Sequence, residues 1–451
     1  MRYNFRFLAR IIIEAATPIV VKSGEKSILT DGIVLRDVND LPYIPGTSIA
    51  GVMRHAWKNA GKNVDAIFGF QENDGGEGSK IIFSEARILD SCGRVVDGLQ
   101  EITDDFLKNY ELLPIRQHVR ITDKGVAADK GKFDEEIVYA GTRFCFEMEM
   151  LANEDDKTTF DELLATLQSR TFRLGSGTRN GFGEIKIVSI WSKALNLSQK
   201  EDIDAYLSKS SNLEVSKKWY TDKQEVNPQL IEWTCYKLQL TPSDFFLFGS
   251  GFGDDEADMT PVKERRVFWN GKSAQLGEYS YLVPASSIKG AIAHRVAFHY
   301  NKLKGNYADL LSDEDRKKLI GKNNEAVKTL FGSEGDEKGK GKLRGNVLFS
   351  DLYLETNADK LLNHVAIDRF TGGAIDGALF TEKVTYGEGE GWSIELLVNS
   401  QSIEENVMMA FELALDDICK GMLPLGGGVN RGHGTFTGEI LKNGKVLCVG
   451  R

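Results

Sequence analysis

The residues best suited to chemistry are carboxylates in two loops, one in each half of the chain. The polar, glycine-containing stretch 23–40 carries Asp31 and Asp37. The corresponding loop of the second half carries Asp254, Asp255, Glu256 and Asp258. With a pKa of about 3.9, aspartate is a poor base at neutral pH, but it can hold Mg²⁺ or a water molecule bound to that ion. A solvated acidic loop is the alternative interpretation.

Two glycine-rich stretches, 175–183 and 426–434, share the spacing Gly-x-Gly-x-x-x-Gly-x-Gly. Glycine tolerates positive φ and lets the backbone approach a ligand closely, so such a loop can cradle phosphates. Arginine and asparagine side chains at the two tips add charge-assisted donors. The candidate binding residues are Gly177, Arg179, Asn180 and Gly181, and then Gly428, Asn430, Arg431 and Gly432. A turn that only reverses the chain is the alternative.

A third repeated motif predicts the start of an amphipathic helix in each half. The stretch 45–55 returns as 284–294, at a constant offset of 239 positions. A serine or threonine after the proline predicts an N-cap, and the free N–H groups of the first turn can bind an anion. The polar candidates are Ser48, Arg54, Ser287, Lys289 and Arg295. His55 and His294 lie two turns into these helices, where a structural histidine is expected rather than a general base.

Basic residues gather in a stretch, 116–136, that fits neither helical nor strand periodicity. A matching stretch runs from His364 to Glu382 in the second half. His364 corresponds to His118 and Glu382 to Glu136, both at an offset of 246 positions. Basic residues with a few apolar ones suit an element that contacts phosphates and unstacks bases, stacking being worth about 1–3 kcal/mol per base. The candidates are Arg116, His118, Arg120, His364 and Arg369. A charged surface loop is the alternative.

The elements that must position these residues have the same order in both halves. In the first half we predict strands at 2–14, 81–89, 142–151 and 184–190 and helices at 47–60 and 159–168. The second half repeats this βαββαβ order and adds a hairpin at 262–283 that turns at Asn270-Gly271. We therefore expect an α+β fold with two tandem ferredoxin-like (RRM-like) domains, each with an inserted segment. Their expected bounds are 1–195 and 231–451, joined by a polar linker at 196–230.

Composition restricts the class of protein. With 451 residues, two domains are the natural expectation. No apolar run is long enough for a membrane span, no secretory signal is recognisable, and the five scattered cysteines fit a reducing cytoplasm. The formal net charge of −10 argues against nucleic acid as a partner, although it does not exclude a local basic groove.

The order of the motifs in both halves resembles the RAMP superfamily of CRISPR effector proteins. Each half has the helix start, then Phe-Gly, then Phe-Ser-acid, and finally the glycine-rich loop. The two intermediate motifs lie at 68–69 and 83–85, and at 331–332 and 349–351. The resemblance omits the linker and the 262–283 hairpin, and it is greatest to two fused copies of the backbone subunit of type III complexes.

This resemblance implies a palm that lies along guide RNA, a thumb that wedges between guide and target, and a filament-like complex with other effector subunits. We call 116–136 and 364–382 the first and second thumbs. Asp31 matches the aspartate that cuts target RNA in cleaving members. Asp258 is its nearest counterpart in the second half, with Asp254 and Asp255 as rivals. The implied cofactor is Mg²⁺ or another divalent cation, bound only together with RNA.

Two other activities remain open from the sequence. The chain could be a non-catalytic, guide-binding structural subunit in which both acidic loops are inert. It could also be a metal-independent ribonuclease that processes the guide, with His55 or His294 as acid and base. A chelator separates the two enzymatic alternatives, because it should abolish only the metal-dependent cutting of target RNA.

Overall fold

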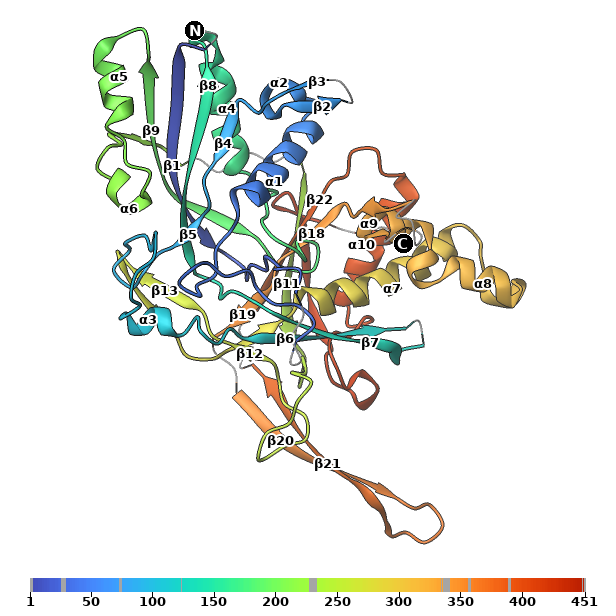
Figure 1. Cartoon of the computed structure of the whole chain (residues 1–451). Helices are drawn as coiled ribbons and strands as arrows, with labels where there is room; N and C mark the ends of the chain where they lie inside the picture. The colour runs from blue at the N-terminus through green and yellow to red at the C-terminus, as the bar shows by residue number, and fades with distance from the viewer. Residues whose placement is uncertain are drawn as a thin grey trace.

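The computed structural model describes residues 3–25, 30–72, 75–122, 124–226, 233–333, 335, 341–355, 358–387, 391–447 and 449. An antiparallel sheet forms the frame of the first half (Figure 1). Its strands, in spatial order, are β10 (Asp222–Gln224), β9 (Ile185–Asn196), β1 (Phe5–Ala15), β8 (Arg143–Ala152) and β4 (Ile81–Phe83), and β5 (Arg87–Ile88) also pairs with β8. The alternating apolar residues of β1 supply the buried face of this sheet.

Two helices, α1 (Gly46–Asn59) and α4 (Lys157–Leu167), contribute to the core on this sheet. In α1, Ile49, Met53 and Trp57 are buried at intervals of four residues, which forms the apolar stripe of an amphipathic helix. The start of α4 lies two residues before the expected start at 159. Asn153 and Asp156 form a capping box around the 3₁₀ turn η1 (Glu154–Asp156), which leads into this helix.

A second antiparallel sheet frames the second half. Its strands, in spatial order, are β18 (Val347–Phe349), β22 (Trp392–Val398), β11 (Thr234–Pro242), β23 (Phe436–Lys442) and β24 (Lys445–Val446). The helices α7 (Ala285–Leu303) and α10 (Glu405–Cys419) share its core. In both sheets the first and third main strands of the half are central, and the second and fourth flank them.

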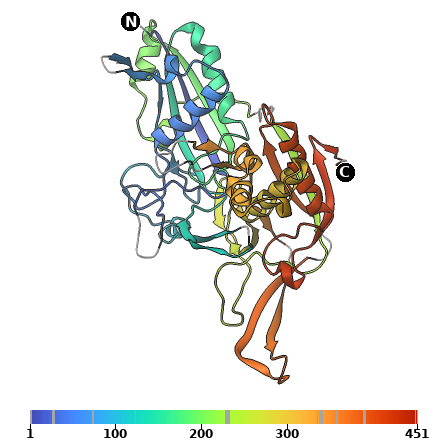
Figure 2. The same cartoon turned by 90° about the vertical axis from the view of Figure 1, so that its right-hand side faces the viewer.

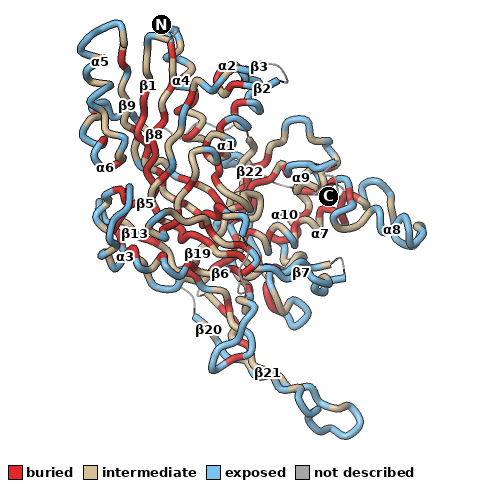
Figure 3. Tube along the Cα trace, in the orientation of Figure 1, coloured by how far each residue is buried: buried red, intermediate tan, exposed pale blue. Residues whose placement is uncertain are grey.

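Both thumbs are two-stranded hairpins rather than the irregular segments that the sequence predicted. The first pairs β6 (Ile115–Ile121) with β7 (Ala127–Glu136), and the second pairs β20 (Ala358–Ile367) with β21 (Ala374–Tyr386). The second thumb projects far from the body in both views (Figures 1 and 2). Its outer part is exposed (Figure 3), so no buried face imposes the alternation by which strands are recognised.

The segment expected to be a linker folds against the first half. It forms α5 (Lys200–Leu207) and α6 (Leu213–Ser216), and β10 extends the first sheet. Leu213 and Tyr220 are buried, and the side chain of Arg10 donates to the carbonyl of Leu213. The expected linker also includes residues 227–230, which lie outside the described residues.

The hairpin insertion of the second half packs on the first half. It pairs β13 (Val267–Asn270) with β14 (Ser273–Leu276), close to the expected turn. Val267 and Ala274 belong to the core of the first half, and Trp269 Nε1 donates to the carbonyl of Gly141 at 2.8 Å. The two halves are therefore interlocked.

The remaining elements are short. They are α2 (Asp65–Phe68), β2 (Phe70–Glu72), β3 (Gly75–Glu77), α3 (Asp105–Lys108), β12 (Lys263–Glu264), β15 (Ser280–Val283), η2 (Ala308–Leu310), α8 (Asp313–Leu319), η3 (Gly321–Asn323), α9 (Glu325–Phe331), β16 (Gly332–Ser333), β17 (Leu343–Arg344), β19 (Leu352–Leu354) and η4 (Val429–Arg431). None of the helices in the described part of the chain is long and apolar enough to cross a membrane.

Candidate functional site

Asp31 lies against the base of the first thumb. Its backbone N–H donates to Oδ1 of Asp134 in β7 at 2.9 Å, and the N–H of Asp134 donates to Oδ2 of Asp31 at 3.4 Å. Two residues further along β7, the N–H of Glu136 donates to the carbonyl of Gly32 at 2.9 Å. We call this reciprocal contact between an acidic loop and a thumb strand a clasp. It fixes Asp31 on an exposed part of the surface.

The second half contains the same clasp, with Asp258 in the place of Asp31. The N–H of Asp258 donates to Oγ1 of Thr381 in β21 at 3.1 Å, and the N–H of Thr381 donates to Oδ2 of Asp258 at 2.8 Å. The N–H of Lys383 then donates to the carbonyl of Met259 at 2.8 Å. Asp258 is thus the structural counterpart of Asp31.

The rival residue Asp254 is used differently. Its Oδ1 accepts the N–H groups of Glu256 and Ala257, and its Oδ2 lies 2.5 Å from Nζ of Lys383. The hydrogen bond from Lys383 lowers the pKa of Asp254 to about 2. Asp254 therefore shapes the turn that presents Asp258. The backbone and hydroxyl donors of Thr381 lower the pKa of Asp258, so this carboxylate is ionised at neutral pH.

The oxygen atoms at the clasps suit a metal cation that also binds another molecule. The first clasp offers the carboxylates of Asp31 and Asp134, and the second offers Asp258 and the hydroxyl of Thr381. The described residues contain no group of three or more histidine, cysteine, aspartate or glutamate side chains arranged to hold a metal ion. Mg²⁺ needs six oxygen ligands and readily takes several from water and phosphate, so these residues fit a cation bound jointly with RNA.

The first glycine-rich loop does not lie open to solvent, because it docks on the second half. A Cβ added to Gly181, whose φ is +111°, would approach Ala285 Cβ to 2.6 Å. Arg179 Nε donates to the carbonyl of Gly345 at 2.9 Å, and Lys289 Nζ donates to Oδ1 of Asn180 at 2.8 Å. This loop is thus part of the junction between the halves.

The expected serine and threonine N-caps are wrong. The N-cap residues are Pro45 and Pro284, neither of which makes a side-chain capping bond. Ser48 and Ser287 lie inside the first turn. In α7 the first N–H, that of Ala285, donates to Oδ1 of Asp351 at 2.9 Å, so the protein itself supplies an anion at this helix start.

Two basic residues expected to contact RNA are committed to ion pairs. Arg116 is 4% exposed, and it donates to both oxygens of Glu264 and to Oδ2 of Asp351. Arg295 in α7 is partly exposed, and its Nε lies 2.5 Å from Oδ2 of Asp417. Each guanidinium is used inside the protein, where a nearby carboxylate offsets the cost of desolvation.

Three cationic side chains that have no carboxylate partner among the described residues gather at the junction. We call Arg179, Lys289 and Arg344 the junction cations, and the imidazole of His55 lies near them. Burial and then the charge of Arg179 lower the pKa of Lys289 to about 8, and burial and then Arg344 lower the pKa of Arg179 to about 9. Burial, followed by Arg344 and Arg179, also lowers the pKa of His55.

Within the described part of the chain, Arg179 and Lys289 form no ion pair with a carboxylate, and Nη1 of Arg179 is a buried atom without a hydrogen-bond partner. Like charges that depress one another's pKa attract an anion from solution. The junction is therefore the strongest candidate phosphate site among the described residues.

The second glycine-rich loop has the same turn in a different environment. A Cβ added to Gly428 would meet the ring of His433 at 2.5 Å, as one added to Gly177 would meet Phe182. Asn430 and Gly432 are exposed, whereas Arg431 Nη2 donates to Oε2 of Glu382 at 2.6 Å.

The three remaining predicted arginines lie on the surface, and two predicted histidines lie at the thumb bases. Arg54 is exposed and lies 3.4 Å from Oδ1 of Asp65. Arg120 and Arg369 are exposed on the first and second thumbs, respectively. His118 and His364 lie at the bases of the thumbs, each stacked on a phenylalanine.

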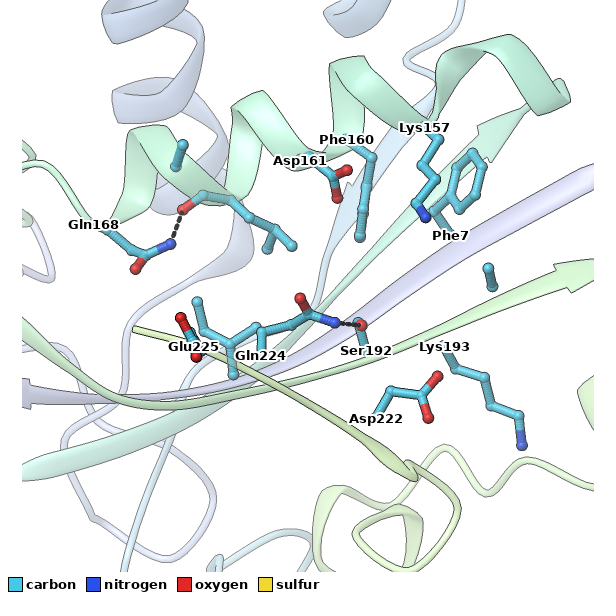
Figure 4. A pocket seen from close by; sticks show the side chains of 14 residues that line it. Phe7, Lys157, Phe160, Asp161, Gln168, Ser192, Lys193, Asp222, Gln224 and Glu225 are labelled. Atoms are coloured by element: carbon cyan, nitrogen blue, oxygen red, sulfur yellow. Dashed lines mark hydrogen bonds between the residues drawn. The ribbon is translucent and has the colours of Figure 1, made fainter. Parts of the chain in front are cut away.

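A cavity of about 370 Å³ between α4 and the β9–β10 edge is separate from these residues (Figure 4). Its lining includes Lys157 and Lys193, but also Asp161 and Asp222. Glu225 also lines it, so the carboxylates outnumber the lysines and the cavity lacks the excess of cations that a phosphate would require.

Comparison with known proteins identifies the family. A family model described as "RAMP superfamily" matches residues 12–186 and 240–437, one region in each half. The chain therefore belongs to the RAMP superfamily. A chain in a structure titled "Type III-B Cmr-beta Cryo-EM structure of the Apo state" is 17% identical, with a TM-score of 0.31 over 40% of this chain and 96% of that one. No curated protein matches this sequence.

Several functional candidates emerge only from the structure. Asp134 and Thr381 complete the clasps, and Arg344 joins the junction cations. Asp351, which accepts from the first N–H of α7, is a further such residue. For this residue the sequence offered a signal, since it is the acidic residue of a Phe-Ser-acid motif that already marked the repeat. The others depend on pairings between segments that are far apart in the chain.

Proposed function

We propose that this chain is a tandem backbone subunit of a cytoplasmic type III CRISPR ribonucleoprotein, which binds guide RNA and cleaves the paired target RNA. The observation that carries the proposal is the repeated clasp, which holds Asp31 and Asp258 in equivalent contacts with the two thumbs. Membership of the RAMP superfamily supports the class of protein. The common strand order of the two sheets supports a ferredoxin-like βαββαβ plan for each half.

Guide binding is assigned to the junction cations and is mainly electrostatic. A phosphate of the guide supplies the negative charge that Arg179 and Lys289 lack within the described chain. The exposed arginines of the thumbs, Arg120 and Arg369, extend the basic surface outward.

Cleavage is assigned to the two clasped carboxylates. In the proposed reaction the neighbouring 2′-oxygen attacks the target phosphodiester in line. The O2′–P bond forms as the P–O5′ bond breaks, the 2′-hydroxyl proton passes to water, and the leaving 5′-oxygen takes a proton from water, which leaves a 2′,3′-cyclic phosphate and a 5′-hydroxyl. A divalent cation on Asp31 or Asp258 would stabilise the negative charge that develops on the phosphate oxygens. The clasps hold these side chains against the thumbs, which fixes where along the RNA they act.

Other effector subunits are proposed to continue the arrangement seen between the two halves. The first glycine-rich loop docks on the start of α7, whereas the tip of its counterpart in the second half is exposed. The second thumb also projects freely (Figure 2). A further domain of the same family would fit this open end.

A cleavage assay with mapped products tests the proposed function. The guide-loaded protein is expected to cut a complementary RNA at two positions in Mg²⁺, to stop in EDTA, and to recover when excess Mg²⁺ is added. No cutting in Mg²⁺ would favour the structural subunit. Cutting of the guide RNA that persists in EDTA would favour the histidine-based ribonuclease that processes the guide.

A variant with both Arg179→Ala and Lys289→Ala is expected to bind guide RNA more weakly and with a flatter salt dependence. Each phosphate contact that is lost should reduce the slope of log K against log salt by about 0.7 for single-stranded RNA. Filter binding across a salt series measures both quantities. Arg316→Ala is the control, since Arg316 is an exposed cation on the peripheral helix α8. An unchanged affinity and slope in the double variant would refute the junction site.

A further inference from the structure

A buried glutamate follows the clasp residue of each thumb. Glu135 follows Asp134 and is 5% exposed, and Glu382 follows Thr381 and is 0% exposed. The sequence had paired Glu136 with Glu382, but the clasp hydrogen bonds align Glu135 with Glu382 instead. Burying a carboxylate is costly unless it is partnered, so a repeated buried glutamate requires a repeated set of partners.

Glu382 joins three segments of the second half. Its Oε1 lies 2.7 Å from Nε2 of His364 in β20 and 3.0 Å from Nε2 of His433 in the glycine-rich loop. Its Oε2 accepts from Nη2 of Arg431 at 2.6 Å. One carboxylate thus ties both thumb strands to the body of the domain.

Glu135 has an analogous set of partners. Its Oε1 lies 3.2 Å from Nε2 of His118 in β6, and its Oε2 lies 2.8 Å from Nζ of Lys22 in the body. His118 stacks on Phe133 with ring centroids 4.8 Å apart, as His364 stacks on Phe380 at 4.7 Å. The glutamate, the histidine and the stacked ring therefore recur as a unit. The link to the glycine-rich loop differs, because Phe182 replaces His433 and touches His118 edge-on.

We infer that Glu135 and Glu382 are positioning residues for the clasped carboxylates Asp31 and Asp258, an inference that rests on the proposed function. Each glutamate holds its thumb strand at the residue next to the clasp. The main chain of that strand supplies the N–H groups that hold the acidic loop. A strand released at this point no longer fixes the carboxylate, and a displacement of about 1 Å can cost roughly a hundredfold in rate.

The alternative role is one of fold stability alone. A purely stabilising ion pair would change the unfolding midpoint and would affect both cuts or neither. A positioning role is local to one clasp. The two halves therefore serve as controls for each other within one molecule.

The test uses Glu382→Gln and Glu135→Gln in the guide-loaded, full-length chain, with single-turnover rates measured separately at each cut. Glutamine keeps the size of the side chain and removes its charge. Glu382→Gln is expected to slow the cut assigned to Asp258 by about 10–100-fold and to leave the other cut within about twofold. Glu135→Gln should do the reverse, and guide affinity should not change in either variant. Glu404→Gln is the matched control, because it removes a carboxylate that pairs with Lys304 outside both clasps.

His433→Gln provides a milder variant if loss of Glu382 impairs folding. It removes one partner of that carboxylate and should slow the same cut selectively. Equal slowing of both cuts, or two unchanged rates, would overturn the inference. Asp31→Ala and Asp258→Ala are measured in parallel. If they erase their cuts while the glutamate variants do not, only the positioning role fails. If they leave both cuts intact, the proposed function itself fails.

Discussion

Asp31→Ala is expected to erase one of two cuts in the target RNA and to leave the other at its normal rate. The clasp holds Asp31 against the first thumb only, and Asp258 has its own clasp on the second. Removal of a group that positions a metal or stabilises a transition state commonly costs about a hundredfold or more in rate. Product mapping on a denaturing gel, with rates fitted for each band, measures the effect.

Asp258→Ala should erase the other cut and leave the cut assigned to Asp31 at its normal rate. Asp255→Ala is the matched control, since Asp255 is an exposed neighbour outside the clasp. Guide affinity should be unchanged in all three variants, because the junction cations do not depend on the acidic loops. If Asp31→Ala cut both sites at the normal rate, the chain would be better described as a structural subunit.

The second large effect concerns stability. Arg116→Ala is expected to lower the free energy of unfolding by about 3–5 kcal/mol, because Glu264 and Asp351 would remain buried without a counter-charge. Both carboxylates belong to the second half, so the loss also weakens the contact between the halves. Urea unfolding monitored by tryptophan fluorescence and by circular dichroism measures the change.

Arg120→Ala is the control for this experiment, because Arg120 lies on the same strand, β6, but is exposed. It should leave the unfolding midpoint unchanged. The sequence-based interpretation of Arg116 as a phosphate contact predicts a different result. In that case Arg116→Ala would weaken guide binding without changing stability.

The frame of the fold could be predicted because its signals are local. A strand was expected at 142–151 and β8 spans Arg143–Ala152, and α1 begins within one residue of its expected start. In both cases the apolar period matches the face that is buried. The repeat itself was visible for the same reason, since each copy needs the same turns in the same order.

The site could be predicted only in part, because its contacts join distant segments. The sequence could not separate Asp258 from Asp254, since only the bond to Thr381 distinguishes them. It placed Arg116 on the surface because its two carboxylate partners are 148 and 235 positions away. Gly181 was predicted to contact phosphate, but in the structure it packs against the start of α7.

The β13–β14 hairpin, which belongs to the second half and fills part of the core of the first, has a consequence for the length of the RNA products. With Val267 and Ala274 buried across the boundary, the halves cannot slide or rotate against each other without emptying part of the core of the first. The distance between the two clasps is then fixed by the protein and does not depend on the RNA. Every target, whatever its sequence, should release an internal fragment of one length.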